Sequence, residues 1–206
     1  NGYTFDMGPS WYWMPDVIEE FFNDFGYKTS DFYELVSLDP QFEIIFKDQA
    51  ISFPESFDDA IQLFESLESG AGQKLVDFMA DAKIKYDIGM KDFVTRPCLS
   101  ITEFLTPKIA QQGLKLNLLT NYRDFVAKYF KHPYLQQIME FPVIFLGASP
   151  KNIPALYSLM NYGGYKMGTW YPMGGFYKLI EAMEKIAIGL GVEIFKNSDV
   201  TKINTI

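Results

Sequence analysis

The stretch from Thr169 to Phe195 constrains the fold more than any other part of the chain. It predicts a short aromatic strand over 169–171 and an amphipathic helix over 176–190, because apolar residues recur in that helix at three- and four-residue spacing. Gly174 and Gly175 lie between the two elements. Glycines before a helix let the backbone approach a ligand at the helix N-terminus, where N–H groups favour an anion. The same pair also suits a plain strand-to-helix turn, and both interpretations stay open.

The other elements follow from hydrophobic periodicity and from the positions of glycine and proline. Three early strands should form an antiparallel meander, which is expected to join strand 169–171 in one mixed sheet. A helical cap should cover that sheet. The strands are expected at 32–38, 41–46, 50–53 and 192–195, and the helices at 15–25, 56–67, 73–90, 114–130 and 155–162, with Gly163 and Gly164 ending the last of these helices.

These elements predict an α+β fold in a single domain over 1–206. A strand-rich segment (1–54) precedes the helical cap (55–165), and return strands and a helix (166–206) complete the domain. We find no repeat and no linker long enough to divide the chain.

Charge and composition exclude several classes of function. A net charge of −8 argues against nucleic acid, whose phosphates bind clustered Lys and Arg. The one cysteine, Cys98, cannot form an internal disulfide, so a reducing, cytoplasmic compartment is expected. Aromatic residues make up 17% of the chain. They fit either a large core or a tunnel for a long apolar ligand.

Side chains for nucleophilic or metal chemistry are scarce. The single histidine, His132, lies between Lys131 and Pro133. It has no cysteine or carboxylate partner at zinc-like spacing, so we expect a surface residue at a helix junction and no metal site.

Five segments resemble, in order, the phytoene desaturase family, whose members are carotenoid desaturases and isomerases with an amine-oxidase-like flavoprotein fold. The segments are YTFDMGPS at 3–10, LDP at 38–40, GASP and ALYSL within 147–159, YPMGG at 171–175, and GLGV with NSDVTKI within 189–203.

The resemblance implies an FAD-dependent oxidoreductase in which the flavin takes a hydride from a polyene. The family's first domain holds FAD on a G-x-G-x-x-G turn, which this chain lacks. We therefore expect an internal substrate-side fragment without its Rossmann-type FAD domain, which binds no FAD alone and is inactive. Its expected partners are that missing FAD domain, an apolar polyene substrate and, peripherally, a membrane.

The same resemblance places Asp6, Gly8, Gly174 and Gly175 near the flavin as cofactor-binding residues. Asp6 has a structural alternative, which is to cap a backbone turn. Met173 stands where some members of the family carry Arg or Lys.

For the substrate side, the resemblance indicates Trp170, Tyr171 and Tyr157 as contacts and Glu103 as a candidate catalytic acid. Ser100 and Glu103 also fit a helix capping box, which is the simpler interpretation. A second function class stays open, a non-catalytic domain that binds apolar ligands or lipid.

Overall fold

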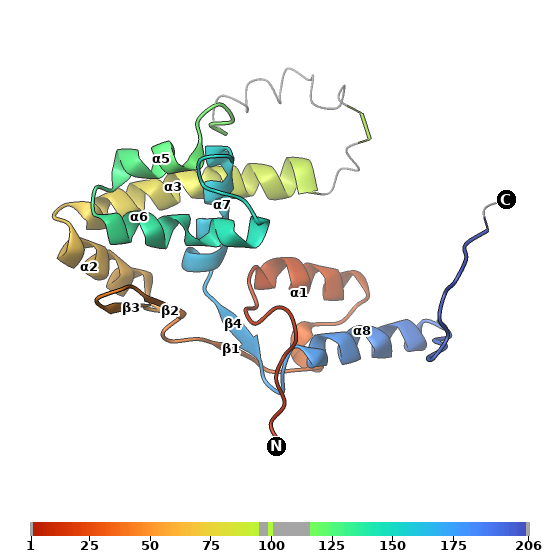
Figure 1. The fold of residues 1–206 in the computed structure, drawn as a ribbon. Coiled ribbons are helices and arrows are strands. Elements are labelled where there is room, and N and C mark those ends of the chain that lie inside the picture. The colour runs from red at the N-terminus through yellow and green to blue at the C-terminus, as the bar shows by residue number, and fades with distance from the viewer. Residues whose placement is uncertain (1, 95–98, 101–115, 205–206) are drawn as a thin grey trace. The chain divides into compact units, whose positions relative to one another are not determined.

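A computed structural model describes residues 2–94, 99–100 and 116–204 (Figure 1). The chain divides into two compact units, and it passes between them several times. The first unit comprises Asn1–Ser10, Pro15–Val36 and Tyr171–Ile206, and the second comprises Trp11–Met14 and Ser37–Trp170. The expectation that both act as one domain stays a prediction.

The described part of the first unit contains two α-helices. The predicted helix at 15–25 is confirmed as α1 (Pro15–Asp24). It begins at Pro15, whose missing N–H does not weaken the helix because N–H groups in the first turn have no acceptor within the helix. A short 3₁₀ helix, η1 (Thr29–Asp31), follows. The helix predicted at 176–190 is confirmed as α8 (Tyr177–Gly189).

The strand predicted at 192–195 is wrong. The described residues beyond Gly191 form no strand and are exposed. A β-branched run becomes a strand only where a second segment pairs with it, and none does so in the described part of this unit.

Among the residues that the structure describes, the strands are short and form two separate two-stranded sheets, so the predicted meander and single mixed sheet are also wrong. Strands β2 and β3 pair antiparallel, with Phe42 opposite Phe53, whereas β1 shares its sheet with β4. Pro40, which has no N–H to continue a ladder, separates β1 from β2. The strands are β1 (Leu35–Ser37), β2 (Phe42–Ile45), β3 (Ala50–Phe53) and β4 (Trp170–Pro172).

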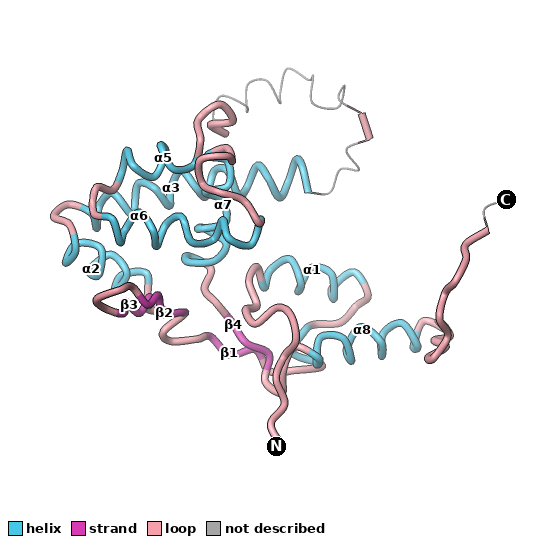
Figure 2. The backbone as a smooth tube through the Cα atoms, viewed as in Figure 1, coloured by secondary structure: helices cyan, strands magenta, loops and turns pink. Residues whose placement is uncertain are grey.

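Helices make up most of the described part of the second unit, as Figure 2 shows. The predicted α2 (Phe57–Leu67) and α3 (Ala71–Gly89) are confirmed. The Ser56 hydroxyl accepts a hydrogen bond from the Asp59 N–H at 3.4 Å and caps α2. Ile84 shares the apolar spacing of α3 but is 48% exposed. A short π-helix, η2 (Met90–Val94), follows α3.

The helix predicted at 114–130 begins later than expected. Residues 114 and 115 lie outside the described part, and α5 spans only Tyr122–Tyr129. Asn117 has a φ of 51°, which ends any regular helix there. Asn121 instead starts α5, because its side-chain oxygen accepts a hydrogen bond from the Asp124 N–H at 2.9 Å. The apolar face of α5 is buried in the core.

His132 caps the next helix, α6 (Pro133–Glu140), and its Nδ1 accepts a hydrogen bond from the Tyr134 N–H at 3.3 Å. A 3₁₀ helix, η4 (Phe141–Leu146), continues directly from α6.

Gly163 and Gly164 do not end the helical segment that starts at Ala155, contrary to the prediction. A β-carbon on Gly164 would lie 2.9 Å from the Trp13 ring, and one on Gly163 would lie 3.3 Å from the Tyr86 ring. These glycines therefore serve close packing rather than chain termination. The segment comprises η5 (Ala155–Ser158), α7 (Leu159–Asn161) and the π-helix η6 (Tyr162–Lys166).

Gly164→Ala is expected to lower the free energy of unfolding by about 1–3 kcal/mol, because Trp13 must move to admit the methyl group. Gly189→Ala is the matched control, since a β-carbon on this helical glycine meets nothing within 4 Å. The control should be neutral or stabilising by up to about 1 kcal/mol. Urea unfolding of both variants checks the prediction, and equal effects would contradict it.

Within the described residues, no helix is long and apolar enough to cross a membrane.

Candidate functional site

Asp6 joins the N-terminal segment to the turn that leads into α8. Its Oδ1 accepts a hydrogen bond from the Phe176 N–H at 2.9 Å, and its Oδ2 accepts one from the Tyr171 hydroxyl at 2.6 Å. The rings of Tyr171 and Phe176 meet edge to face at 5.9 Å. The structure thus gives Asp6 the backbone-capping contact that the sequence offered as an alternative, and the negative charge lies where the N-terminus of α8 favours it.

Gly174 and Gly175 have φ values of 93° and 96°, which L side chains rarely adopt. A β-carbon on Gly175 would also lie 3.0 Å from Asp6 Oδ1. The turn therefore needs glycine both for its dihedrals and for the approach of Asp6.

These residues do not fit the pyrophosphate of a dinucleotide. The Asp6 carboxylate already accepts the Phe176 N–H, and a second anion beside that carboxylate would be repelled. Contact of Gly174, Gly175, Asp6 or Gly8 with a flavin stays a prediction.

Of the predicted site residues, the structure brings together Asp6, Tyr171 and Gly175. Gly8 is exposed, and a β-carbon there would meet nothing within 4 Å. Trp170 belongs to the second unit and donates its indole N–H to the Met167 carbonyl at 3.0 Å.

The remaining predicted residues lie elsewhere. Tyr157 is in η5 and packs, partly buried, against the core of the second unit. Glu103 and Cys98 lie outside the described residues. The part of the chain that is described holds no group of three His, Cys, Asp or Glu side chains that could bind a metal ion.

Replacing Asp6 with Asn is expected to lower the pKa of the Tyr171 phenol toward its usual value. In the native chain the hydrogen bond to the Asp6 carboxylate raises that pKa, because a negative neighbour disfavours phenolate. Ultraviolet difference titration above pH 9 measures the change, and Tyr171→Phe identifies the transition. Superimposable titrations of Asp6→Asn and the native protein would show that the contact is absent.

An aromatic cluster in the second unit was not predicted as a site. It comprises Trp11, Trp13, Phe141 and Phe145. The Trp11 ring lies 5.6 Å from Trp13 and 5.5 Å from both Phe141 and Phe145. The first three side chains are partly buried and Phe145 is 55% exposed. In the sequence, only the WYW string at 11–13 points to this cluster, because Phe141 and Phe145 come from η4, more than a hundred residues away.

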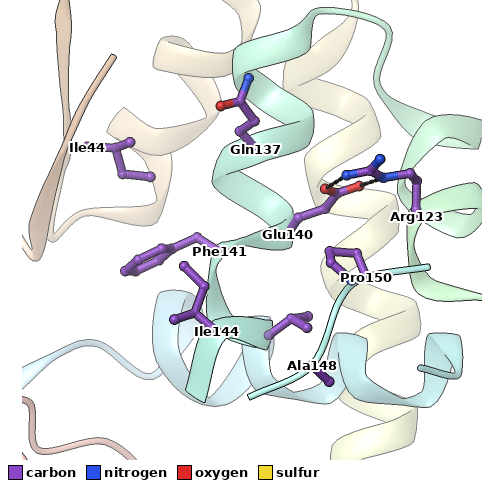
Figure 3. A pocket seen from close by; sticks show the side chains of 9 residues that line it. Ile44, Arg123, Gln137, Glu140, Phe141, Ile144, Ala148 and Pro150 are labelled. Atoms are coloured by element: carbon purple, nitrogen blue, oxygen red, sulfur yellow. Dashed lines mark hydrogen bonds and ion pairs between the residues drawn. The ribbon is translucent and has the colours of Figure 1, made fainter. Parts of the chain in front are cut away.

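A pocket of about 290 Å³ lies between β2, α5, α6 and η4, and Phe141 of the aromatic cluster is one of its lining residues. Figure 3 shows Arg123 and Glu140 directed toward each other at one end of the pocket, and Phe141 and Ile144 toward the other. The Arg123 Nε and Nη2 groups donate to the two Glu140 oxygens at 3.1 and 3.0 Å. The pocket is lined by Ile44, Arg123, Gln137, Glu140, Phe141, Val143, Ile144, Ala148 and Pro150.

Lys85 is a second feature that the sequence did not indicate. Its side chain is fully buried and pairs with Asp81. It also donates to the Ser158 hydroxyl at 3.0 Å and lies 3.9 Å from the Phe125 ring centroid. Burial lowers the pKa of the ammonium, while the bond to Asp81 opposes that shift.

Comparison with known proteins identifies a family. Residues 1–205 match the family described as flavin containing amine oxidoreductase. The chain is 35% identical to a carotenoid 3,4-desaturase of Haloarcula japonica, over 99% of this chain and 42% of that protein. It is 27% identical to a zeta-carotene-forming phytoene desaturase of Myxococcus xanthus, over 100% of this chain and 40% of that protein.

A 4,4'-diapophytoene desaturase of Staphylococcus aureus is 29% identical, over 98% of this chain and 41% of that protein. The chain thus spans about two fifths of the length of these curated relatives. The resemblance to carotenoid desaturases that the sequence motifs indicated is confirmed.

Proposed function

Because the chain belongs to the family of flavin-containing amine oxidoreductases, we propose that it is the substrate-binding part of an FAD-dependent desaturase. The substrate would be a carotenoid or another long apolar polyene. The names of the three relatives support this class, since they are desaturases of a carotenoid, phytoene and diapophytoene.

The aromatic cluster is the observation that carries the proposal. Each of the four rings lies within 6 Å of at least two of the others, and Phe145 is more than half exposed. The conjugated part of a polyene is flat and apolar, so aromatic faces and edges suit it better than polar side chains do. In the proposal these rings hold and orient the polyene, and the pyrophosphate of FAD is bound by residues outside 1–206.

Peripheral contact with a membrane is part of the proposal, because such substrates dissolve in lipid. Supporting it, Ile144, Phe145 and Leu146 on η4 are between 40% and 65% exposed. Side chains of this kind can enter the interface without spanning the bilayer.

The test uses the full-length gene product that contains residues 1–206. It should purify with bound flavin and convert a carotenoid precursor to a product that absorbs at longer wavelength. Phe145→Ala should raise KM about two- to tenfold, the value of one aromatic contact, with unchanged flavin content. Leu119→Ala is the control, since Leu119 is fully exposed and lies outside the cluster.

A protein that retains carotenoid or lipid but has no flavin absorbance and no turnover would overturn the proposal. That result would favour the second function class, a non-catalytic binder of apolar ligands.

A further inference from the structure

The pocket bounded by Arg123 and Glu140 has the features of a binding site for one end of an amphipathic molecule. Six of its nine lining side chains are apolar, and the polar ones, Arg123, Gln137 and Glu140, come from α5 and α6. Gln137 and Glu140 are three residues apart on α6, so their side chains leave the helix on the same face. A ligand in the pocket therefore meets an apolar wall at one end and hydrogen-bonding groups at the other.

The size of the pocket limits what it can hold. Its volume is about 290 Å³, near the lower end of the range of roughly 300–1,000 Å³ that is typical of pockets for small ligands. A pocket of this size fits the end of a long polyene and not the whole of it.

The charge of the polar end disfavours ions. Arg123 and Glu140 form two parallel hydrogen bonds and neutralise each other. An anionic headgroup would approach the Glu140 carboxylate, and a cationic one the Arg123 guanidinium, so either would be opposed by a nearby like charge. A neutral hydroxyl or carbonyl meets no such opposition. The guanidinium has five N–H groups, of which Glu140 accepts two, and the Gln137 amide can both donate and accept.

The pocket is also next to the aromatic cluster. Phe141 lines the pocket and its ring lies 5.5 Å from Trp11. A chain held by the cluster could therefore place its end in the pocket.

We infer that the pocket between α5, α6 and η4 binds the neutral, oxygen-bearing end of an isoprenoid chain. The inference rests on the proposed function for the identity of that chain as the polyene substrate. It adds an end-group preference that the proposed function does not contain.

The first experiment measures binding of three ten-carbon probes to the full-length gene product by ligand-observed NMR titration at pH 7.5. The probes are geraniol, the hydrocarbon that lacks its hydroxyl, and geranic acid, which is ionised at this pH. Geraniol should bind about five- to tenfold more tightly than either of the others, the value of about one neutral hydrogen bond. Equal or tighter binding of the acid or the hydrocarbon would overturn the inference.

Variants locate the site. Ile144→Trp should weaken geraniol binding at least about tenfold by filling the pocket, because Ile144 lines it yet is 65% exposed, so that folding should be unaffected. Leu119→Trp is the matched control, a similar enlargement at an exposed position that does not line the pocket. Gln137→Met should reduce the preference for geraniol over the hydrocarbon without changing hydrocarbon binding. Unchanged geraniol binding in Ile144→Trp would place the site elsewhere and overturn the inference.

Flavin content and polyene turnover, measured on the same preparations, separate the two proposals. Failure of geraniol to bind with turnover intact rejects the pocket alone. Loss of flavin and turnover with the geraniol preference intact rejects the proposed function and leaves the pocket as an amphiphile site.

Discussion

Asp81→Asn is expected to lower the free energy of unfolding by about 3–5 kcal/mol, because it leaves a buried ammonium without its carboxylate partner. The Lys85 side chain is 0% exposed, whereas that of Asp81 is 29% exposed. The Ser158 hydroxyl and the Phe125 ring also contact the Lys85 ammonium. Both groups are neutral and cannot replace the lost carboxylate charge. The loss of stability cannot exceed about 5 kcal/mol at pH 7, because removing the proton from an ordinary lysine costs about that much free energy at this pH. If the buried charge cost more, the chain would fold with a neutral lysine.

Lys85→Met is the control for this pair. It removes the buried charge, keeps a side chain of similar length, and leaves Asp81 partly in contact with water. Replacement of buried ions by apolar groups of similar volume is often neutral or stabilising. We therefore expect urea unfolding to show a large loss for Asp81→Asn and little change for Lys85→Met. The opposite order would mean that the Lys85 hydrogen bonds matter more than its desolvation.

The pair also predicts how stability changes with pH. Burial lowers the pKa of Lys85 in the folded chain, so over the alkaline range below about 10.4 the unfolded state binds more protons than the folded state. Stability from this group therefore rises with pH across that range. In Asp81→Asn the rise should be larger and begin at lower pH, because the carboxylate no longer favours the charged form.

Elements with strong local signals were predictable from the sequence. α1 begins at Pro15, α2 is capped by Ser56, and both follow a regular apolar stripe. The same kind of stripe correctly predicted α8, but Ile180 within the helix and Leu190 directly after it, both in that stripe, are more than half exposed. Periodicity therefore identified the helix without identifying what covers it.

Features that depend on distant residues were not predictable. Gly163 and Gly164 are typical of a helix end, and only the approach of Trp13 and Tyr86 explains them. Asp81 and Lys85 are four residues apart, a spacing typical of a solvent-exposed ion pair. Nothing local shows that Ser158 and Phe125 bury the lysine.

The candidate site likewise combines features that have a local sequence signal with features that depend on distant residues. Asp6 and Gly175 lie in two of the motifs that the sequence indicated, and the Asp6 carboxylate accepts a hydrogen bond from the Phe176 N–H at the start of α8. Their contact with a flavin stays a prediction. The aromatic cluster and the Arg123–Glu140 pocket combine residues from several elements. Composition indicated only an excess of aromatic side chains.

Glu68→Gln is expected to lower the free energy of unfolding by about 1–3 kcal/mol at pH 7, the value of charge-assisted hydrogen bonds to a partly buried carboxylate. Glu68 directly follows α2 and accepts three hydrogen bonds. The donors are the Lys74 ammonium at 2.6 Å and the N–H groups of Lys131 and His132, each at 2.7 Å. One carboxylate thus ties α3 and the start of α6 to the end of α2, and a glutamine amide nitrogen cannot accept any of these bonds.

Acid should abolish the difference between Glu68→Gln and the native protein. Burial favours the neutral acid, but the bonds from Lys74, His132 and Lys131 outweigh it and lower the pKa of Glu68 to about 2. Because this value is below that of the unfolded chain, about 4.3, the contribution is complete above the unfolded value and is lost as the pH falls toward 2. Urea unfolding at pH 7, 4 and 2.5 should show a shrinking difference, while Glu20→Gln, at an exposed position in α1, should stay within about 0.5 kcal/mol throughout. A difference at pH 2.5 as large as that at pH 7 would assign the effect to side-chain packing, since the unfolded state is protonated by then and most of the contribution from the lowered pKa should be lost.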